Sequence, residues 1–254
     1  MNDHPARFSY AWVVLALGFA VVFGALGLAR FGYTLVLPAM QGGLGISNTQ
    51  AGALATVNLV GYLVLAAVGG ALASRFGPRG VISVGLALSG FGMLMTGLAQ
   101  GFGMVAFWRG MTGVGSGASN VPVMGLLSAW FGKRRRGFAT GLAASGSSAA
   151  LILLGLTAPR LLGDYGENGW RVCWFLFGGI ALAIAVSTAI LLRNRPSEKG
   201  MVPLGDDSPG HGADKAPEPR RGIGHVYTSP AAWYMGLIYT AFVFSFIIYI
   251  TFFF

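Results

Sequence analysis

Acidic residues are scarce in this chain of 254 residues, which has 8 Asp and Glu against 17 Lys and Arg, and only 10% of its residues are charged. No Asp, Glu or His occurs inside a long apolar run. The three histidines, for example, all lie in polar segments, at His4, His211 and His225. A catalytic Ser or a catalytic metal at membrane depth would need such a side chain as its base or ligand. The sequence therefore disfavours a membrane hydrolase, and we expect no enzymatic activity and no cofactor.

Cysteine is almost absent as well. The one cysteine, Cys173, lies within an apolar run. A single thiol cannot form a disulfide framework or a thiolate metal site within the chain. We therefore expect no disulfide and no bound metal.

Apolar residues, in contrast, are abundant: 54% of the chain is hydrophobic, and 41 positions are Gly. A helix needs about 20 apolar residues to cross a hydrocarbon core of about 30 Å. Runs of that length recur between short polar breaks, six of them complete and a seventh at the end, near residues 11–37, 50–73, 80–99, 104–130, 138–162, 170–192 and 231–254. The sequence thus predicts an all-α integral membrane protein surrounded by the lipid bilayer.

The basic residues predict how the chain is oriented. If the runs alternate across a membrane, most Lys and Arg fall on one side, which is expected to be cytoplasmic. The predicted organisation is a cytoplasmic N-terminal tail, a six-helix transmembrane bundle, a flexible cytoplasmic linker and a seventh transmembrane helix, at 1–10, 11–192, 193–229 and 230–254. The expected location is a cell membrane, with a bacterial inner membrane favoured. The net charge of +9 is explained by this topology and by anionic lipid headgroups, so we expect no nucleic-acid partner.

A polar motif separates the second and third runs. Residues 70–79 read Gly-Ala-Leu-Ala-Ser-Arg-Phe-Gly-Pro-Arg, which resembles G-x-L-A-D-R-x-G-R-R/K, the loop signature of the major facilitator superfamily of transporters. Glycines permit a tight turn, and arginines can bind carbonyls at helix ends. We expect a conformational motif made of Gly70, Ser74, Arg75, Gly77 and Arg79. Ser74 stands where the signature has Asp. The motif therefore lacks the acidic side chain that the signature provides beside its arginines.

A second motif lies in the fourth run. Residues 109–115 read Arg-Gly-Met-Thr-Gly-Val-Gly, similar to the R-x-x-x-G-x-G signature of that helix in the same family, which adds Arg109 and Gly113 to the conformational motif. The resemblance implies a secondary transporter that works by alternating access, with an N-terminal six-helix bundle of two three-helix repeats. Because the family fold has twelve spans, the chain is expected to be the first half plus the start of the second, with a C-terminal half as a further partner.

Two ionisable side chains, Arg30 and Arg109, lie inside apolar runs. A charge at the bilayer centre costs at least about 2.5 kcal/mol, so such residues are candidates for function. In the family that this sequence resembles, the first and fourth helices face a central cavity. We hypothesise that a small organic anion, a carboxylate, binds there near the two guanidinium groups. The alternatives are that Arg109 makes a structural hydrogen bond to a neighbouring helix and that Arg30 reaches the outer headgroups.

Polar residues at helical spacing complete the predicted substrate site. Its expected members are Arg30, Tyr33, Thr34, Asn58, Tyr62, Arg109, Ser116 and Asn120. The same side chains could instead join helices by hydrogen bonds.

Two other functions remain open at this stage. One is an exporter of hydrophobic or cationic compounds, although the fifth run lacks the Gly-Pro pair associated with antiporters of the family. The other is a non-transporting half-protein that acts as an assembly partner, since the last apolar run ends at Phe254 without a polar tail.

Overall fold

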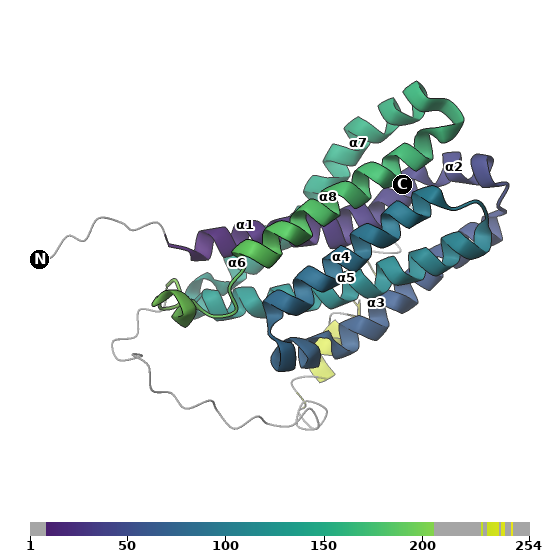
Figure 1. Cartoon of the computed structure of the whole chain (residues 1–254). Helices are drawn as coiled ribbons and strands as arrows, with labels where there is room; N and C mark the ends of the chain where they lie inside the picture. The colour runs from purple at the N-terminus through teal and green to yellow at the C-terminus, as the bar shows by residue number, and fades with distance from the viewer. Residues whose placement is uncertain (1–8, 206–229, 231–232, 239, 242–244, 246–254) are drawn as a thin grey trace, which may run out of the picture. The chain divides into compact units, whose positions relative to one another are not determined.

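The computed structural model describes residues 9–205 and, further along the chain, residues 230, 233–238, 240, 241 and 245. The chain divides into two compact units, Met1–Asp206 and Asp207–Phe254, and the helices α1 to α8 all belong to the first unit. Most of the predicted linker and of the predicted seventh helix lies outside the described residues. In the first unit nearly every described residue is helical, and the helices run side by side (Figure 1).

The first apolar run forms one helical rod from Ala11 to Leu44. It has three parts: α1 (Ala11–Val22), the π-helix η1 (Phe23–Phe31) and α2 (Gly32–Leu44). The rod ends where Gly45 adopts a φ of 64°, a left-handed conformation that glycine adopts without the steric cost of a Cβ atom. The π-helical segment lies midway along the rod, and its last two residues, Arg30 and Phe31, line a cavity.

The next two helices have clear start signals. Helix α3 (Asn48–Phe76) begins with a capping box, in which the Ser47 Oγ accepts from the Gln50 backbone N–H at 3.2 Å and the Gln50 Oε1 accepts from the Ser47 N–H at 2.9 Å. These bonds satisfy two backbone N–H groups that a helix start leaves unpaired. Helix α4 (Pro78–Leu98) starts with a proline at its first position, where the missing N–H costs nothing.

The remaining helices are α5 (Phe102–Trp130), α6 (Lys133–Ala144), α7 (Gly146–Tyr165) and α8 (Gly169–Leu191). The 3₁₀ turn η2 (Gly166–Asn168) joins α7 to α8, and η3 (Pro196–Lys199) follows α8.

Within the described residues, four helical segments are long and apolar enough to cross a membrane, Ala11–Leu44, Asn48–Phe76, Pro78–Leu98 and Lys133–Leu191. Helix α5 is as long as α3 but is not among them. Composition alone therefore does not establish the predicted count of six spans.

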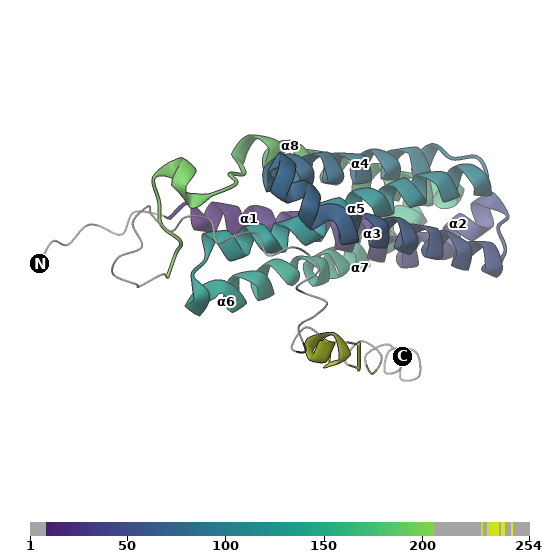
Figure 2. The ribbon, with the colours of Figure 1, turned by 90° about the horizontal axis from the view of Figure 1, so that it is seen from below.

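Helix α5 is the centre of the packing: it lies against α3 and α4, α4 also packs on α8, and α7 packs on η1 (Figure 2). Glycines allow these close approaches. A Cβ atom on Gly61 of α3 would overlap the Gly110 carbonyl oxygen of α5, and one on Gly85 of α4 would lie 2.7 Å from the Ser119 Oγ. Small residues therefore set the distances between these helices, as is typical of helices packed in lipid.

Large apolar side chains cover the outer faces of the helices. Leu63 and Val64 of α3 are each 56% exposed, and Ile152 of α7 is 69% exposed. Exposed apolar surface of this extent needs a nonpolar surrounding. The helices thus belong to a protein embedded in a membrane.

The residues after α8 turn back onto the bundle. The Leu204 N–H donates to the Trp130 carbonyl at 3.0 Å, and the Leu204 carbonyl accepts from the Gly132 N–H at 3.0 Å. The Trp130 Nε1–H in turn donates to the Arg193 carbonyl at 3.1 Å. The first part of the predicted linker is therefore packed on the turn between α5 and α6.

Candidate functional site

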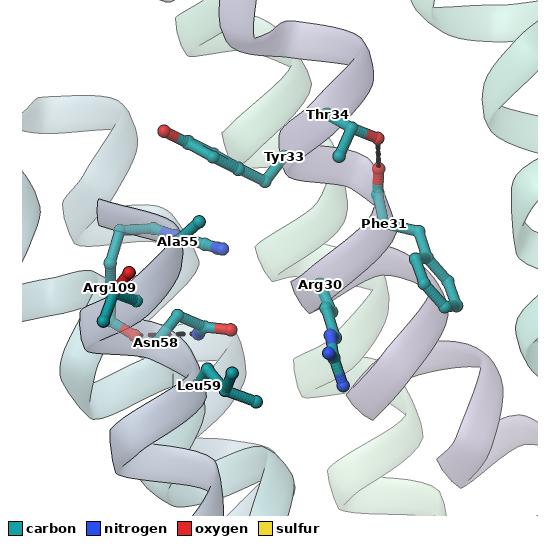
Figure 3. A pocket seen from close by; sticks show the side chains of 9 residues that line it. Arg30, Phe31, Tyr33, Thr34, Ala55, Asn58, Leu59 and Arg109 are labelled. Carbon is teal, nitrogen blue, oxygen red and sulfur yellow. Dashed lines mark hydrogen bonds between the residues drawn. The ribbon is translucent and has the colours of Figure 1, made fainter. Parts of the chain in front are cut away.

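A cavity of about 290 Å³ lies between the first rod and α3, with one residue of α5 in its wall (Figure 3). Its lining residues are Arg30, Phe31, Tyr33, Thr34, Ala55, Thr56, Asn58, Leu59 and Arg109. Five of the eight predicted substrate-site residues thus line one cavity. This volume is at the lower end of the range of small-molecule sites in proteins.

Arg30 is the exposed cation of this cavity. It lies in the last turn of η1, and its side chain extends away from Tyr33 and Thr34 (Figure 3). Within the described part of the chain, its guanidinium group forms no hydrogen bond or ion pair. Phe31 and Leu59 give the wall around it an apolar character. The cavity therefore offers a positive group with unused hydrogen-bond donors beside apolar surface.

Arg109 lies at the same cavity but is only 1% exposed. Its Nη1–H donates to the Ala29 carbonyl oxygen of η1 at 2.7 Å. Its Cζ lies 4.6 Å from the ring centroid of Tyr33 and 5.1 Å from that of Trp174, so the cation is stabilised by two aromatic rings. Arg109 thus makes the hydrogen bond to a neighbouring helix that the sequence left open as its alternative role.

The other polar lining residues are bonded to backbone carbonyls. The Tyr33 O–H donates to the Ala51 carbonyl at 2.8 Å and joins α2 to α3, and the Asn58 Nδ2–H donates to the Arg109 carbonyl at 2.8 Å and joins α3 to α5. The Thr34 O–H donates to the Phe31 carbonyl of its own rod at 2.8 Å. These bonds fix three of the polar side chains that line the cavity.

Three predicted site residues lie away from this cavity. The Asn120 Nδ2–H donates to the Tyr62 Oη at 2.9 Å, so this pair joins α5 to α3. The Ser116 Oγ donates to the Thr112 carbonyl at 2.9 Å, and it also lies 3.1 Å from the Ser89 Oγ of α4. Contact of these three residues with a substrate stays a prediction.

The motif at residues 70–79 forms the turn from α3 to α4. Gly77 has a φ of 86°, which explains the glycine at that position. The Arg79 Nε–H donates to the Ala189 carbonyl near the end of α8 at 2.7 Å, and the Arg79 backbone N–H donates to the Asn194 Oδ1 at 2.8 Å. Arg79 therefore anchors the start of α4 to the end of α8.

Ser74 and Arg75 behave differently from Arg79. The Ser74 Oγ donates to the Ala71 carbonyl within α3 at 2.8 Å, so it does not cap the start of a helix. Arg75 is exposed, and its Cζ lies 5.4 Å from the ring centroid of Phe76. Neither side chain joins α3 to another helix through a hydrogen bond in the described residues.

Sequence reasoning missed the carbonyl groups of Ala29 and Ala51 and the ring of Trp174, which hold Arg109 and Tyr33 in place. Every residue has a backbone carbonyl, so the residue type does not indicate which carbonyl will bind a side chain. The approach of α8 to α5 depends on packing that a pattern along the chain does not encode. Within the described residues, no group of three or more His, Cys, Asp and Glu could hold a metal ion.

Known proteins resemble this chain in sequence. Monocarboxylate transporter 11 of Mus musculus is 32% identical over 189 residues, which is 74% of this chain and 41% of that protein. Puromycin resistance protein pur8 of Streptomyces alboniger is 30% identical over 184 residues, which is 70% of this chain and 36% of that protein. The chain thus spans less than half the length of these relatives.

The fold is also known from solved structures. The crystal structure of a bacterial homolog to the human lysosomal transporter Spinster, in its inward-facing and occupied conformation, matches with a TM-score of 0.64 at 17% identity, covering 75% of this chain and 46% of that chain. Such low identity supports the fold alone. The family model described as Major Facilitator Superfamily matches residues 11–254. This match confirms the resemblance carried by the two motifs, and the chain belongs to the major facilitator superfamily of membrane transporters.

Proposed function

We propose that this chain serves a secondary transporter that moves a small organic anion by alternating access, with Arg30 as the residue that binds the anion. One observation carries the proposal: the guanidinium group of Arg30 faces a cavity of about 290 Å³ and has no acidic partner in the described residues. A guanidinium group can bind a carboxylate through two parallel hydrogen bonds. A carboxylate at this position would offset the cost of an unpaired charge inside the membrane.

The walls of the cavity support a carboxylate with an apolar body. Phe31, Ala55 and Leu59 contribute apolar surface beside Arg30. An inorganic anion would leave this surface without a partner. The similarity to a monocarboxylate transporter agrees with this substrate class.

The proposal includes an arrangement of spans. The first rod, α3, α4, α5, the α6–α7 pair and α8 would be the six spans of an N-terminal bundle built from two three-helix repeats, as the family fold implies. The N-terminal tail and the segment after α8 would lie in the cytoplasm, with a bacterial inner membrane as the favoured location. A C-terminal half would supply the other wall of the transport path.

An exporter of hydrophobic or cationic compounds is the second candidate function. The similarity to a puromycin resistance protein and the apolar wall of the cavity favour it. Arg30 weighs against a cationic substrate, because two positive charges within a few ångströms repel each other in a low dielectric.

Thermal stabilisation by ligands tests the proposal. The purified protein, with the remainder of the transporter where this chain is part of a longer one, is heated in detergent with acetate, lactate, benzoate, glucose or tetraphenylphosphonium. We expect stabilisation by carboxylates, and we expect Arg30→Ala to raise the Kd of the best carboxylate roughly tenfold or more, since hydrogen bonds to charged groups contribute about 1.5–3 kcal/mol. Arg30→Lys should keep part of the affinity.

Arg160→Ala is the matched control. Arg160 is an exposed arginine of α7 that does not line the cavity, so its removal tests the effect of losing one positive charge elsewhere. Equal affinity in Arg30→Ala and Arg160→Ala would refute the role of Arg30. Stabilisation by tetraphenylphosphonium alone would favour the exporter.

A further inference from the structure

The π-helical turn η1 is an irregular element at the centre of the site. It spans Phe23–Phe31, and the Gly32 N–H donates to the Gly27 carbonyl, five residues earlier. A π-helical turn is rare because it is less favourable than an α-helical turn, and it persists where surrounding structure supports it. Contacts from other helices must therefore hold η1 in this form.

The register of η1 decides where the cavity residues point. Each residue of an α-helix rotates the chain by about 100°, and a π-turn takes up an extra residue. If η1 changed to an α-helix, the side chains after it would turn about the rod axis by roughly that angle. Arg30 lies in the last turn of η1, and Tyr33 and Thr34 follow it.

Arg109 of α5 forms a hydrogen bond to this turn from another helix. Its Nη1–H donates to the carbonyl of Ala29, directly before Arg30, and its guanidinium group lies over the ring of Tyr33. Arg109 is itself held on its other side, because Trp174 of α8 packs against it and the Asn58 side chain binds its backbone carbonyl. A charged hydrogen bond in a nonpolar environment is strong.

Burial separates the roles of the two arginines. Arg30 is exposed to the cavity, whereas Arg109 is 1% exposed and donates a hydrogen bond to the Ala29 carbonyl. The Nε of Arg109 is buried without a hydrogen-bond partner in the described structure, whereas the guanidinium group of Arg30 is the one that is open to the cavity.

We propose that Arg109 is a positioning residue: by binding the Ala29 carbonyl it holds η1 in its π-helical form and so directs Arg30, Tyr33 and Thr34 toward the cavity. Arg109 does not bind the anion itself. The link to substrate rests on the proposed function, whereas the link to the register of η1 does not.

Cysteine labelling tests the register without any substrate. Thr34→Cys places a thiol on the rod after η1, and Thr56→Cys places one on α3, and both positions are exposed residues of the cavity wall. The native Cys173 is buried, and its replacement by Ser removes background labelling. A water-soluble, negatively charged methanethiosulfonate reagent measures the rate at each position.

Arg109→Gln should lower the labelling rate of Thr34→Cys at least about fivefold and leave that of Thr56→Cys unchanged. If Thr34→Cys is labelled at the same rate with Arg109 and after Arg109→Gln, the proposal is overturned. If the Gln variant does not fold, Arg109→Met decides, because a thioether side chain has no donor for the Ala29 carbonyl. A rate for Thr34→Cys in the Met variant that is equal to that of the native background would then overturn the proposal.

A double-mutant cycle tests whether Arg109 acts through Arg30. Arg109→Gln should weaken benzoate binding roughly tenfold in the native background and less than about twofold when Arg30 is already Ala. Equal losses in both backgrounds would mean that Arg109 binds the anion directly. If Arg30→Ala has no effect on any panel carboxylate, the proposed function fails, and the labelling result still decides the role of Arg109.

Discussion

At the scale of single residues, several arginines of the described structure donate to backbone carbonyls. Arg109 donates to Ala29, Arg79 to Ala189, and the Arg171 Nη1–H donates to the carbonyls of Gly97 and Ala99 at 2.7 and 2.8 Å. Carbonyls at helix ends carry partial negative charge and have no intrahelical partner. This explains the positions of Arg79 and Arg171, whereas the Ala29 carbonyl that binds Arg109 lies within the π-helical turn of the first rod.

Glycines are the second residue-scale feature, and they fall into two classes. A Cβ atom on Gly113 of α5 would overlap the Asn58 carbonyl oxygen of α3, whereas one on Gly70 of α3 would have nothing within 4 Å. The sequence predicts both as members of the conformational motif. Only Gly113 is required by a close approach of two helices in the described structure.

Alanine substitution separates these two glycines. Gly113→Ala should destabilise the protein by about 1–3 kcal/mol, because the helix backbones must move apart to accept the methyl group. Gly70→Ala should be neutral or stabilising by up to about 1 kcal/mol, because alanine favours the helix. Thermal unfolding in detergent measures both, and an equal loss of stability in the two variants would contradict the packing role of Gly113.

At the scale of elements, α4 and α8 form a pair joined along their length. The Ser83 Oγ of α4 donates to the Thr188 Oγ1 of α8 at 3.2 Å, and a Cβ atom on Gly178 would lie 2.7 Å from the Gly90 carbonyl oxygen. Arg79 closes the pair at one end by binding the Ala189 carbonyl. The arginine that ends the 70–79 motif therefore fixes α4 to the last helix of the first unit.

Removing this anchor should weaken the pair. Arg79→Ala leaves the Ala189 carbonyl without its charged donor, and we expect a loss of about 1.5–3 kcal/mol in the free energy of unfolding. Arg75→Ala is the control, with an expected loss below about 1 kcal/mol, since Arg75 is exposed and contacts the Phe76 ring. Thermal denaturation followed by circular dichroism compares the two, and a larger loss for Arg75→Ala would contradict the anchor.

At the scale of the whole molecule, the basic residues and the bundle predict one topology. Asn168, in the turn between α7 and α8, and Ser197, after α8, are both exposed. Helix α8 lies between them. If α8 crosses the membrane with its C-terminal end in the cytoplasm, the two positions lie on opposite sides.

Labelling in intact cells measures this topology. In a Cys173→Ser background, Asn168→Cys should react with a membrane-impermeant maleimide in intact cells, and Ser197→Cys should react only after permeabilisation. The two cysteines serve as controls for each other, since both lie in exposed turns. The opposite pattern would reverse the orientation, and labelling of both in intact cells would show that α8 does not cross the membrane.

Much of the fold was predictable because the underlying signals are local. Apolar length and polar breaks located the helices: the predicted run at 170–192 corresponds to α8, Gly169–Leu191. The motifs at 70–79 and 109–115 identified the family. The two arginines within apolar runs were also evident from the sequence, because a charge within such a run needs no structure to be noticed.

The roles of those two arginines depended on tertiary structure. Helical spacing places Arg109, Ser116 and Asn120 on one stripe, but Ser116 binds partners on α4 and α5 away from the cavity. The π-helical turn and the Ala29 carbonyl that receives Arg109 could not be predicted from the residue types. The sequence by itself determined that long apolar helices suited to a membrane make up the chain, since hydropathy is a property of each segment alone. Only the packed bundle decided which of the two arginines at the cavity is exposed and which is buried, because that choice depends on backbone groups brought together from different helices.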